Sequence, residues 1–335
     1  MLQELTGELE ASRDLPQESA AQALELILAE GTPDREIMAF LSALYSKGET
    51  PAEIAGFARI MRRHAVRLQC RHDRFIDTAG TGGGADTFNV STAAAFVIAG
   101  AGLAVAKHGN RAATSRSGSA DALQALGVQV ARSAEVARQS LDEVGIAFLF
   151  APLFHPAMKR VVQVRRQLPH RTIFNLLGPL TNPAGAPYQI IGVWAPELTR
   201  KLGQALAALG CRRAWVVHSR DGLDELSTAA PSWVTEVEGN RDRSFEFDPA
   251  EYGFAPWDPR AVAGGSPEDN ARLIRRVLEG ERQGPARDLV VLNAAAALRL
   301  AGEADFRVAL DRAGESIDSG SAVRKLDQLV EAYAG

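Results

Sequence analysis

The first seventy residues repeat apolar positions with the period of an α-helix. Helices are expected over 17–31 and after two Thr-Pro pairs, Thr32-Pro33 and Thr50-Pro51. In each pair the threonine is expected to cap the helix and the proline to take its first position. The pattern predicts a small helical unit without obvious chemistry.

After Cys70, short apolar runs alternate with helical stretches. Strands are expected within 102–109, 146–152, 188–195, 213–219 and 232–239, and helices include 197–210 and 286–302. Segment 71–80 is a poor strand candidate because it is rich in polar side chains. The alternation predicts an α/β fold with a mainly parallel central sheet. Segment 167–187, with three prolines in its second half, is interpreted as a helix and a structured loop that bridge the two parts.

Composition narrows the class of protein. The chain has 335 residues, 46% hydrophobic and 23% charged, with a formal net charge of −4 and no long basic block, so no nucleic-acid partner is expected. Its two cysteines, Cys70 and Cys211, form no CxxC pair, which favours a reducing compartment. The polar, acidic N-terminus is unlike a signal peptide. The longest apolar run, of about fourteen residues, is shorter than the roughly 20 that span a bilayer. A cytoplasmic location without a membrane partner is expected.

A glycine-rich stretch, DTAGTGGGADTFNVST, covers Asp77 to Thr92. It matches GxGxxG/A, but the expected acid about 20 residues later is missing, and no Gly-Lys-Ser/Thr follows. Two interpretations stay open: backbone N–H groups that cradle phosphate, or a turn required only for tight packing. The Asn89–Thr92 segment precedes an apolar helix, where free N–H groups and hydroxyls favour an anion. Simple capping by Ser91 or Thr92 is the alternative.

A second polar stretch, KHGNRAATSRSGSAD, runs from Lys107 to Asp121 directly after a predicted strand. It combines a lysine, a histidine, an asparagine, arginines and hydroxyls among small residues. α/β folds bind ligands at the carboxyl ends of their strands. A helix is expected to begin near Ser119. A solvated basic turn is the alternative interpretation.

Five motifs together resemble the anthranilate phosphoribosyltransferase family. They are GTGGGADTFNVST, KHGNRAATSRSGSAD, HPAMKRVVQVRRQL from His155, RTIFNLLGPLTNPA from Arg171, and DGLDELS with Asp224 and Glu225. The resemblance implies a small helical domain (1–69 with roughly 156–181) joined to an α/β domain (70–155 and 182–335), with the site in the cleft between them. It also implies a homodimer and transfer of the phosphoribosyl group of 5-phosphoribosyl 1-diphosphate to the amino group of anthranilate, releasing pyrophosphate, with Mg2+.

The resemblance also assigns residues. For the phosphoribosyl diphosphate they are Gly80, Gly82, Gly83, Gly84, Thr87, Asn89, Val90, Ser91, Thr92, Lys107, His108, Gly109, Asn110, Arg111, Ala112, Ala113, Thr114, Ser115 and Ser119. For anthranilate they are Gly80, His108, Asn110, Arg165, Gly178 and Pro179, and for the metal Ser91, Asp224 and Glu225. Arg166 is expected at the surface, and His155, His170 and His218 are expected to be structural or exposed. No covalent nucleophile is expected, because the reaction needs neutralisation of the leaving group and a correctly placed amine.

The glycine loop departs from the family pattern. Gly84-Ala85-Asp86 stands where the family usually has Asp-Gly and two further residues before the threonine, so the loop is one residue shorter, and Thr114 replaces a commoner serine. The usual acid is missing, and two interpretations of Asp86 stay open: it substitutes for that acid, or it points elsewhere. We expect diphosphate binding to persist, because backbone N–H groups carry most of it. Two rival functions are considered: a pyrimidine nucleoside phosphorylase, which would lack the HPAMK and LGPLTNPA motifs, and a non-enzymatic nucleic-acid-binding relative. That relative would be expected to lose Asp224, Glu225 and Arg165.

Overall fold

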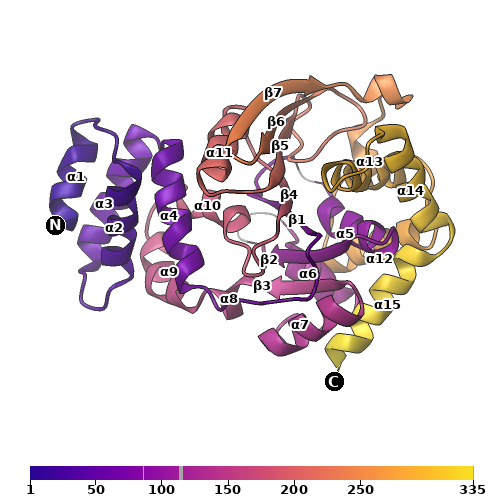
Figure 1. Ribbon diagram of the computed structural model, residues 1–335, viewed down its shortest axis with the longest axis horizontal. Coiled ribbons are helices and arrows are strands. Elements are labelled where there is room, and N and C mark those ends of the chain that lie inside the picture. Colours follow the sequence, from indigo (N-terminus) through magenta and orange to yellow (C-terminus); the bar gives the residue numbers. More distant parts are fainter. Residues whose placement is uncertain (86, 113–115, 335) are drawn as a thin grey trace.

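A computed structural model describes residues 1–85, 87–112 and 116–334. The N-terminal fifth of the chain is helical and lies at one end of the molecule (Figure 1). It contains α1 (Leu2–Glu10), α2 (Gln17–Leu28), α3 (Asp34–Lys47) and α4 (Pro51–His64). Two later helices join it: α9 (Lys159–Arg166) packs on α2 and α3, and α10 (Phe174–Leu177) packs on α4.

The two predicted Thr-Pro helix starts have different outcomes. Thr50 is confirmed as a cap: its hydroxyl accepts from the Glu53 N–H at 3.2 Å, and Glu53 accepts from the Thr50 N–H at 2.8 Å. The prediction for Thr32 is wrong, since Pro33 takes the N-cap position of α3. The Thr32 hydroxyl instead donates to the Leu26 carbonyl at 2.6 Å, near the end of α2 where carbonyls lack helical partners.

The predicted α/β class is confirmed by a seven-stranded mixed sheet in the order β3-β2-β1-β4-β5-β6-β7. The strands are β1 (Phe75–Gly80), β2 (Ala104–Gly109), β3 (Ile146–Phe150), β4 (Tyr188–Gly192), β5 (Arg213–Ser219), β6 (Ser232–Glu238) and β7 (Arg241–Phe247). The first five run parallel, while β6 and β7 extend the sheet as an antiparallel edge.

The interpretation of segment 71–80 as a poor strand is wrong, because β1 lies between β2 and β4 near the middle of the sheet. Its polar residue Asp77 is fully buried, but two groups far along the chain satisfy its carboxylate. The His108 N–H donates at 3.0 Å, and Asn182 Nδ2 donates at 2.8 Å. Buried polar groups persist where such partners exist, and no local pattern could reveal these.

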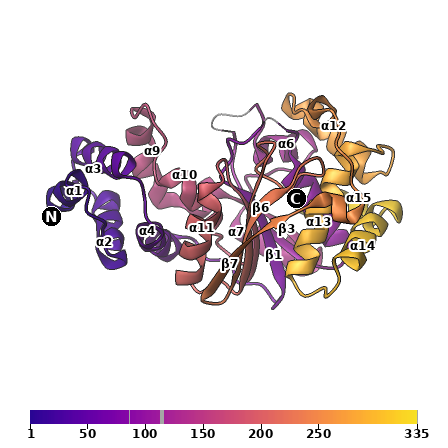
Figure 2. The same cartoon turned by 90° about the horizontal axis from the view of Figure 1, so that it is seen from above.

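The two faces of the sheet belong to two hydrophobic cores. Ile190 contributes to one core and its neighbour Ile191 to the other, as the alternation of a strand requires. Helix α11 (Glu197–Ala208) packs between the sheet and α4, on the side of the helical unit, while α5 (Val90–Gly100) and α13 (Pro285–Leu300) cover the opposite side (Figures 1 and 2). The remaining α-helices of the described residues are α6 (Ser119–Ala125), α7 (Ala134–Glu143), α8 (Ala151–Phe154), α12 (Pro267–Leu278), α14 (Phe306–Asp318) and α15 (Ser321–Ala334). Across the described ranges, every helix is too short or too polar to cross a bilayer.

Candidate active site

The motifs singled out in the sequence meet at one edge of the sheet. Gly80 ends β1 and Gly109 ends β2, and the Asp224-Glu225 turn follows β5. These three strands are parallel members of the same sheet, so their carboxyl ends point to the same edge. Open α/β sheets bind their ligands at this edge.

The glycine loop packs directly on the acidic turn. The Thr81 N–H donates to the Gly192 carbonyl, and the Ala85 N–H donates to the Gly222 carbonyl, each at 2.9 Å. A methyl group added at Gly84 would lie 2.6 Å from Asp224 Oδ1, which is closer than carbon and oxygen can approach. Gly82 and Gly83 have φ of 65° and 87°, in the region that favours glycine. Gly84 is therefore required for packing against Asp224, whereas Gly82 is required for its backbone conformation.

The segment after the loop begins helix α5 at Val90, with Asn89 in the cap position and no side-chain cap. Capping by Ser91 or Thr92 is therefore wrong, since both lie within the first turn. The Asn89 side chain forms hydrogen bonds with two other segments. Its Nδ2 donates to the Ser117 carbonyl at 3.1 Å, and its Oδ1 accepts from Asn270 at 3.0 Å. The residues next to Asn89 in the chain lie in different surroundings. Thr87 forms a backbone bridge with Ala263, Val90 is buried in the core, and the buried hydroxyl of Thr92 has no hydrogen-bond partner in the described structure.

Lys107 brings a buried positive charge to the first turn of α5. Its ammonium donates to the Thr78 carbonyl and, at 3.2 Å, to the Ser91 hydroxyl. Burial lowers the pKa of Lys107 to about 8, although the charges of Asp77 and Glu225 oppose this shift. A lysine held in this way can neutralise an anion with little rearrangement.

Asp224 and Glu225 form a buried acidic pair whose charged forms are disfavoured. Burial raises the pKa of Asp224, and burial together with the Asp224 charge raises the pKa of Glu225 well above its ordinary value. Glu225 Oε2 is buried and has no partner among the described residues. Within the same residues, no third His, Cys, Asp or Glu completes a metal cluster. Two carboxylates fit Mg2+, which binds few protein oxygens and fills its shell with water and phosphate oxygens.

A pair of buried histidines lies beside the LGPL segment. His108 Nδ1 lies 3.1 Å from the Gly178 carbonyl, so this nitrogen carries the proton and Nε2 is left as a buried acceptor without a partner in the described chain. Burial lowers the pKa of His108 to about 3 and that of His155 to about 4, and the two rings are 5.1 Å apart. Pro179 is buried next to this pair, and its carbonyl accepts from Gln189 at 2.8 Å.

The loop after β2 is held together by the start of α6. The Arg111 guanidinium pairs with Asp121 at 2.9 Å, the Ala112 N–H donates to the same carboxylate at 2.9 Å, and the Ser119 hydroxyl donates to the Asn110 carbonyl at 3.3 Å. The start of α6 at Ser119 is confirmed. The predictions for Ala113, Thr114 and Ser115, and the question of Asp86, lie outside the described residues.

Arg165 lies on α9, on the side of the helical unit. Its guanidinium is 5.3 Å from the centre of the Phe174 ring, and burial lowers its pKa. The structure brings the glycine loop, Lys107, Ser91 and the acidic pair together. Among the described residues, no hydrogen bond joins Arg165 to His108. Arg166 is exposed, as predicted, while His155 and His218 are buried and His170 is half-buried.

Sequence reasoning missed the groups that hold this site in place. Asp77 and Asn182 connect the ends of β1 and β2 with the TNP segment, and Thr78 accepts from Lys107. Arg171 approaches the glycine loop from the bridging segment: a methyl group added at Gly83 would collide with its guanidinium, 3.0 Å from Cζ and closer still to Nη2. The RTIFNLLGPLTNPA motif signalled that this segment matters, but its pattern did not indicate which side chain reaches the loop.

Comparison with known proteins agrees with this arrangement over almost the whole chain. The helical bundle domain of a glycosyl transferase family matches residues 3–65, and the a/b domain of that family matches 72–323. A curated anthranilate phosphoribosyltransferase of Moorella thermoacetica is 51% identical over 332 residues, 98% of either chain. The crystal structure of anthranilate phosphoribosyltransferase from Thermus thermophilus superposes with a TM-score of 0.92 at 41% identity, covering 99% of each chain. That of the Saccharomyces cerevisiae enzyme in complex with PRPP and Mg gives 0.90 at 29% identity, covering 99% of this chain and 98% of that one.

Proposed function

The chain belongs to this glycosyl transferase family and, within it, to the anthranilate phosphoribosyltransferases, and on that premise we propose the role of each group in its site. The enzyme transfers the phosphoribosyl group of 5-phosphoribosyl 1-diphosphate to the amino group of anthranilate, a step of tryptophan biosynthesis. The observation that carries the assignment of roles is the acidic pair packed beneath the glycine loop, with Lys107 on the neighbouring strand.

The diphosphate is assigned to the glycine loop and the first turn of α5. Departure of pyrophosphate leaves an oxocarbenium-like ribose, so the site must stabilise negative charge on the leaving group. Lys107 and the Ser91 hydroxyl, 3.2 Å apart, are positioned to do this at the helix N-terminus. The full set assigned to the phosphoribosyl diphosphate is the one given by the family motifs. It lies between Gly80 and Ser119.

Mg2+ is assigned to Asp224 and Glu225, with Ser91 as a further oxygen ligand. The unpartnered Glu225 Oε2 and the raised pKa values of both carboxyl groups fit a bound cation. When bound, the metal neutralises charge on the diphosphate. The support is the chemistry of the residues, together with a relative whose structure is solved in complex with PRPP and Mg.

Anthranilate is assigned to the region between His108, the Gly178-Pro179 turn and Arg165. An arginine fork suits the substrate's carboxylate. Neutral His108 presents Nε2 as an acceptor, which suits the donor N–H groups of an aromatic amine. The Asn110 side chain and the Gly80 backbone complete the assignment. α9 and the sheet carry different parts of this set, so bound anthranilate would lie between them.

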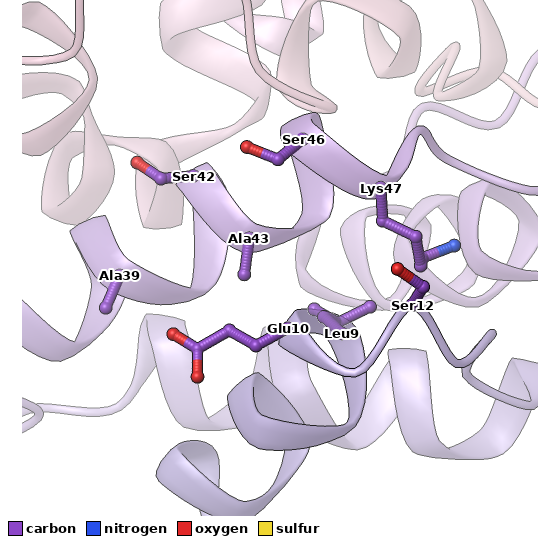
Figure 3. Close-up of a pocket in the computed structure, with 8 residues that line it drawn as sticks. All are labelled: Leu9, Glu10, Ser12, Ala39, Ser42, Ala43, Ser46 and Lys47. Atoms are coloured by element: carbon purple, nitrogen blue, oxygen red, sulfur yellow. The ribbon is translucent and has the colours of Figure 1, made fainter.

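A homodimer through the helical unit is also proposed. A groove of about 450 Å³ lies between α1 and α3, and Figure 3 shows Ala39 and Ala43 pointing from α3 toward α1. These small side chains let α1 and α3 of one chain pack closely, so the proposal of a second copy at this face rests on the family resemblance. Ala43→Arg should then give the mass of one chain instead of two in light scattering, and an unchanged mass would count against this face.

The cytoplasm is proposed as the location, where tryptophan biosynthesis takes place.

The assignments are tested by following anthranilate fluorescence, which falls as anthranilate is converted, with 5-phosphoribosyl 1-diphosphate and Mg2+. Asp224→Asn/Glu225→Gln should abolish the Mg2+-dependent decrease. Arg165→Ala should raise the KM for anthranilate by about ten-fold or more, as expected for loss of a charge-assisted hydrogen bond. Arg166→Ala, a change at the exposed neighbouring position, is the matched control. Full activity of the double acidic variant would contradict the metal assignment.

A further inference from the structure

Arg171 lies over the glycine loop and has no role in the site as assigned so far. Its Cζ would be 3.0 Å from a methyl group added at Gly83, and its Nη2 would be closer still. The guanidinium therefore lies against the backbone of the second of three consecutive glycines. On the following residue, Gly84, the close neighbour is Asp224. The loop thus runs between a cation contributed by the bridging segment and the acidic pair.

Two aromatic contacts, one made by Arg171 and one by the preceding His170, fix the position of the Arg171 side chain. Its Cζ lies 4.1 Å from the centre of the Trp194 ring, which follows β4 and supports the guanidinium from the sheet side. The preceding residue, His170, is anchored on α3: its Nε2 is 3.2 Å from the Ser42 hydroxyl, and its ring stacks on Tyr45 at 4.2 Å. His170 Nδ1 also donates to the Arg171 carbonyl at 2.8 Å. Arg171 is therefore held from both the sheet and the helical unit.

The charge of Arg171 is not neutralised within residues 1–85, 87–112 and 116–334, where no carboxylate forms an ion pair with it. Arg111, by contrast, pairs with Asp121 at 2.9 Å. A planar guanidinium with five donors suits the oxygens of a phosphate group. An anion cradled by the N–H groups of this loop would lie close to that guanidinium.

We propose that Arg171 is a further diphosphate-binding residue, which contacts the leaving group from the side of the loop opposite Asp224. This inference rests on the proposed assignment of the diphosphate to the glycine loop. The bridging segment, which already carries Gly178 and Pro179 on the anthranilate side, would then also take part in diphosphate binding. Trp194 acts as a positioning residue, because its ring holds the guanidinium and touches no substrate itself.

The alternative is that Arg171 only stabilises the loop. The two roles predict different results for the two substrates. A group that touches the diphosphate changes the KM for 5-phosphoribosyl 1-diphosphate and leaves the KM for anthranilate within about two-fold. A group that only orders the loop also disturbs Gly80 and the anthranilate side of the site, so both KM values rise together.

The experiment measures binding of inorganic pyrophosphate, with Mg2+, to the full-length chain by calorimetry. Arg171→Ala should weaken binding by about ten-fold or more, Arg171→Lys less, and the matched control Arg166→Ala should not change it. Trp194→Ala should weaken it in the same direction as Arg171→Ala. If Arg171→Ala is poorly folded in a thermal melt, Arg171→Lys and Trp194→Phe carry the test.

The outcomes separate this inference from the proposed function. No pyrophosphate binding by the unchanged protein would overturn the diphosphate assignment itself. Strong binding by the unchanged protein and equal binding by Arg171→Ala would overturn only the role of Arg171. A parallel rise of both KM values in Arg171→Ala would also overturn it, in favour of a loop-stabilising role.

Discussion

The carboxylate of Asp77 accepts a hydrogen bond from the backbone N–H of His108 at 3.0 Å. This contact joins two strands just before each one enters its functional loop, β1 before the glycine loop and β2 before the polar loop. Asn182 donates to the other carboxylate oxygen at 2.8 Å and also to the Ala106 carbonyl. A single buried carboxylate therefore sets the relative positions of three segments that carry site residues.

Asp77 should make stability depend on pH. Burial raises its pKa to about 6, above the ordinary 3.8, so between these values the folded state binds more protons than the unfolded state. Stability from this group is therefore lost as pH rises from about 4 to about 6, by up to about 3 kcal/mol. Asp77→Asn removes this dependence of stability on pH. The unfolding free energy of the variant, relative to that of the unchanged protein, should therefore increase as pH rises over that range.

The measurement for Asp77 is urea denaturation of both proteins at several pH values between 4 and 7. The useful quantity is the difference in unfolding free energy between them, because other carboxyl groups contribute equally to both. A difference that stays constant across the range would show that the folded pKa of Asp77 is not raised.

The acidic pair should reduce stability in the absence of metal. Glu225 is buried beside Asp224 and its pKa is raised well above the ordinary value, so its charged form is disfavoured in the fold. Glu225→Gln should therefore stabilise the metal-free protein by about 1 kcal/mol or more at pH 7, while removing Mg2+-dependent activity. Thermal melts with EDTA and with Mg2+ check this. Mg2+ should raise the melting temperature of the unchanged protein and not that of the variant. A variant that melts lower in EDTA would contradict the expectation.

Local patterns were enough to predict elements whose stabilising partners lie nearby. The Thr50 cap was predictable because its partner Glu53 is three residues away. The expected cap at Thr32 failed because its hydroxyl binds a carbonyl of the preceding helix. β1 was underestimated because the partners of Asp77 lie 31 and 105 residues away along the chain. β7, with five of its seven residues exposed along an edge, has no apolar run that would predict a strand.

The same difference between near and distant partners decides what could be predicted of the site. The family motifs identified the loops that carry its chemistry, and the structure brings Lys107 and Ser91 together as the pattern of both motifs suggested. The contact of Arg171 with Gly83 could not be predicted, since it depends on how the bridging segment is anchored on α3 and on the Trp194 ring. Such a contact follows from tertiary packing and not from any spacing in the sequence.

Gly84 should tolerate no side chain. An added methyl group would lie 2.6 Å from Asp224 Oδ1 and 2.8 Å from the Asp224 N–H nitrogen, so Gly84→Ala must displace the acidic turn. We expect the Mg2+ concentration needed for half-maximal activity to rise by about ten-fold, equivalent to about 1.4 kcal/mol. Restoring the family's acid with Gly84→Asp should be at least as harmful, because it adds a charge next to Asp224.

The comparison for Gly84 is Gly82→Ala. Gly82 has open space around an added methyl group but a φ of 65°, so that change strains the backbone without touching Asp224. It should affect diphosphate binding more than the Mg2+ requirement. If Gly84→Ala and Gly82→Ala shift the Mg2+ requirement equally, contact with Asp224 is not the cause.

Glu53 should be the most sensitive polar residue of the helical unit. It is fully buried, and its carboxylate accepts from the Leu15 N–H at 2.8 Å, from the Thr50 N–H at 2.8 Å and from Lys47 at 3.0 Å. Glu53→Gln keeps the volume but removes the negative charge and one acceptor oxygen beside Lys47, which should lower the unfolding free energy by about 3 kcal/mol. Asp14→Asn is the control: Asp14 contacts the same Lys47 at 2.8 Å, but its side chain is 69% exposed, so the change should cost less than about 1 kcal/mol. Denaturant midpoints followed by circular dichroism compare the two, and equal losses would mean that burial does not decide the strength of the Lys47 ion pairs.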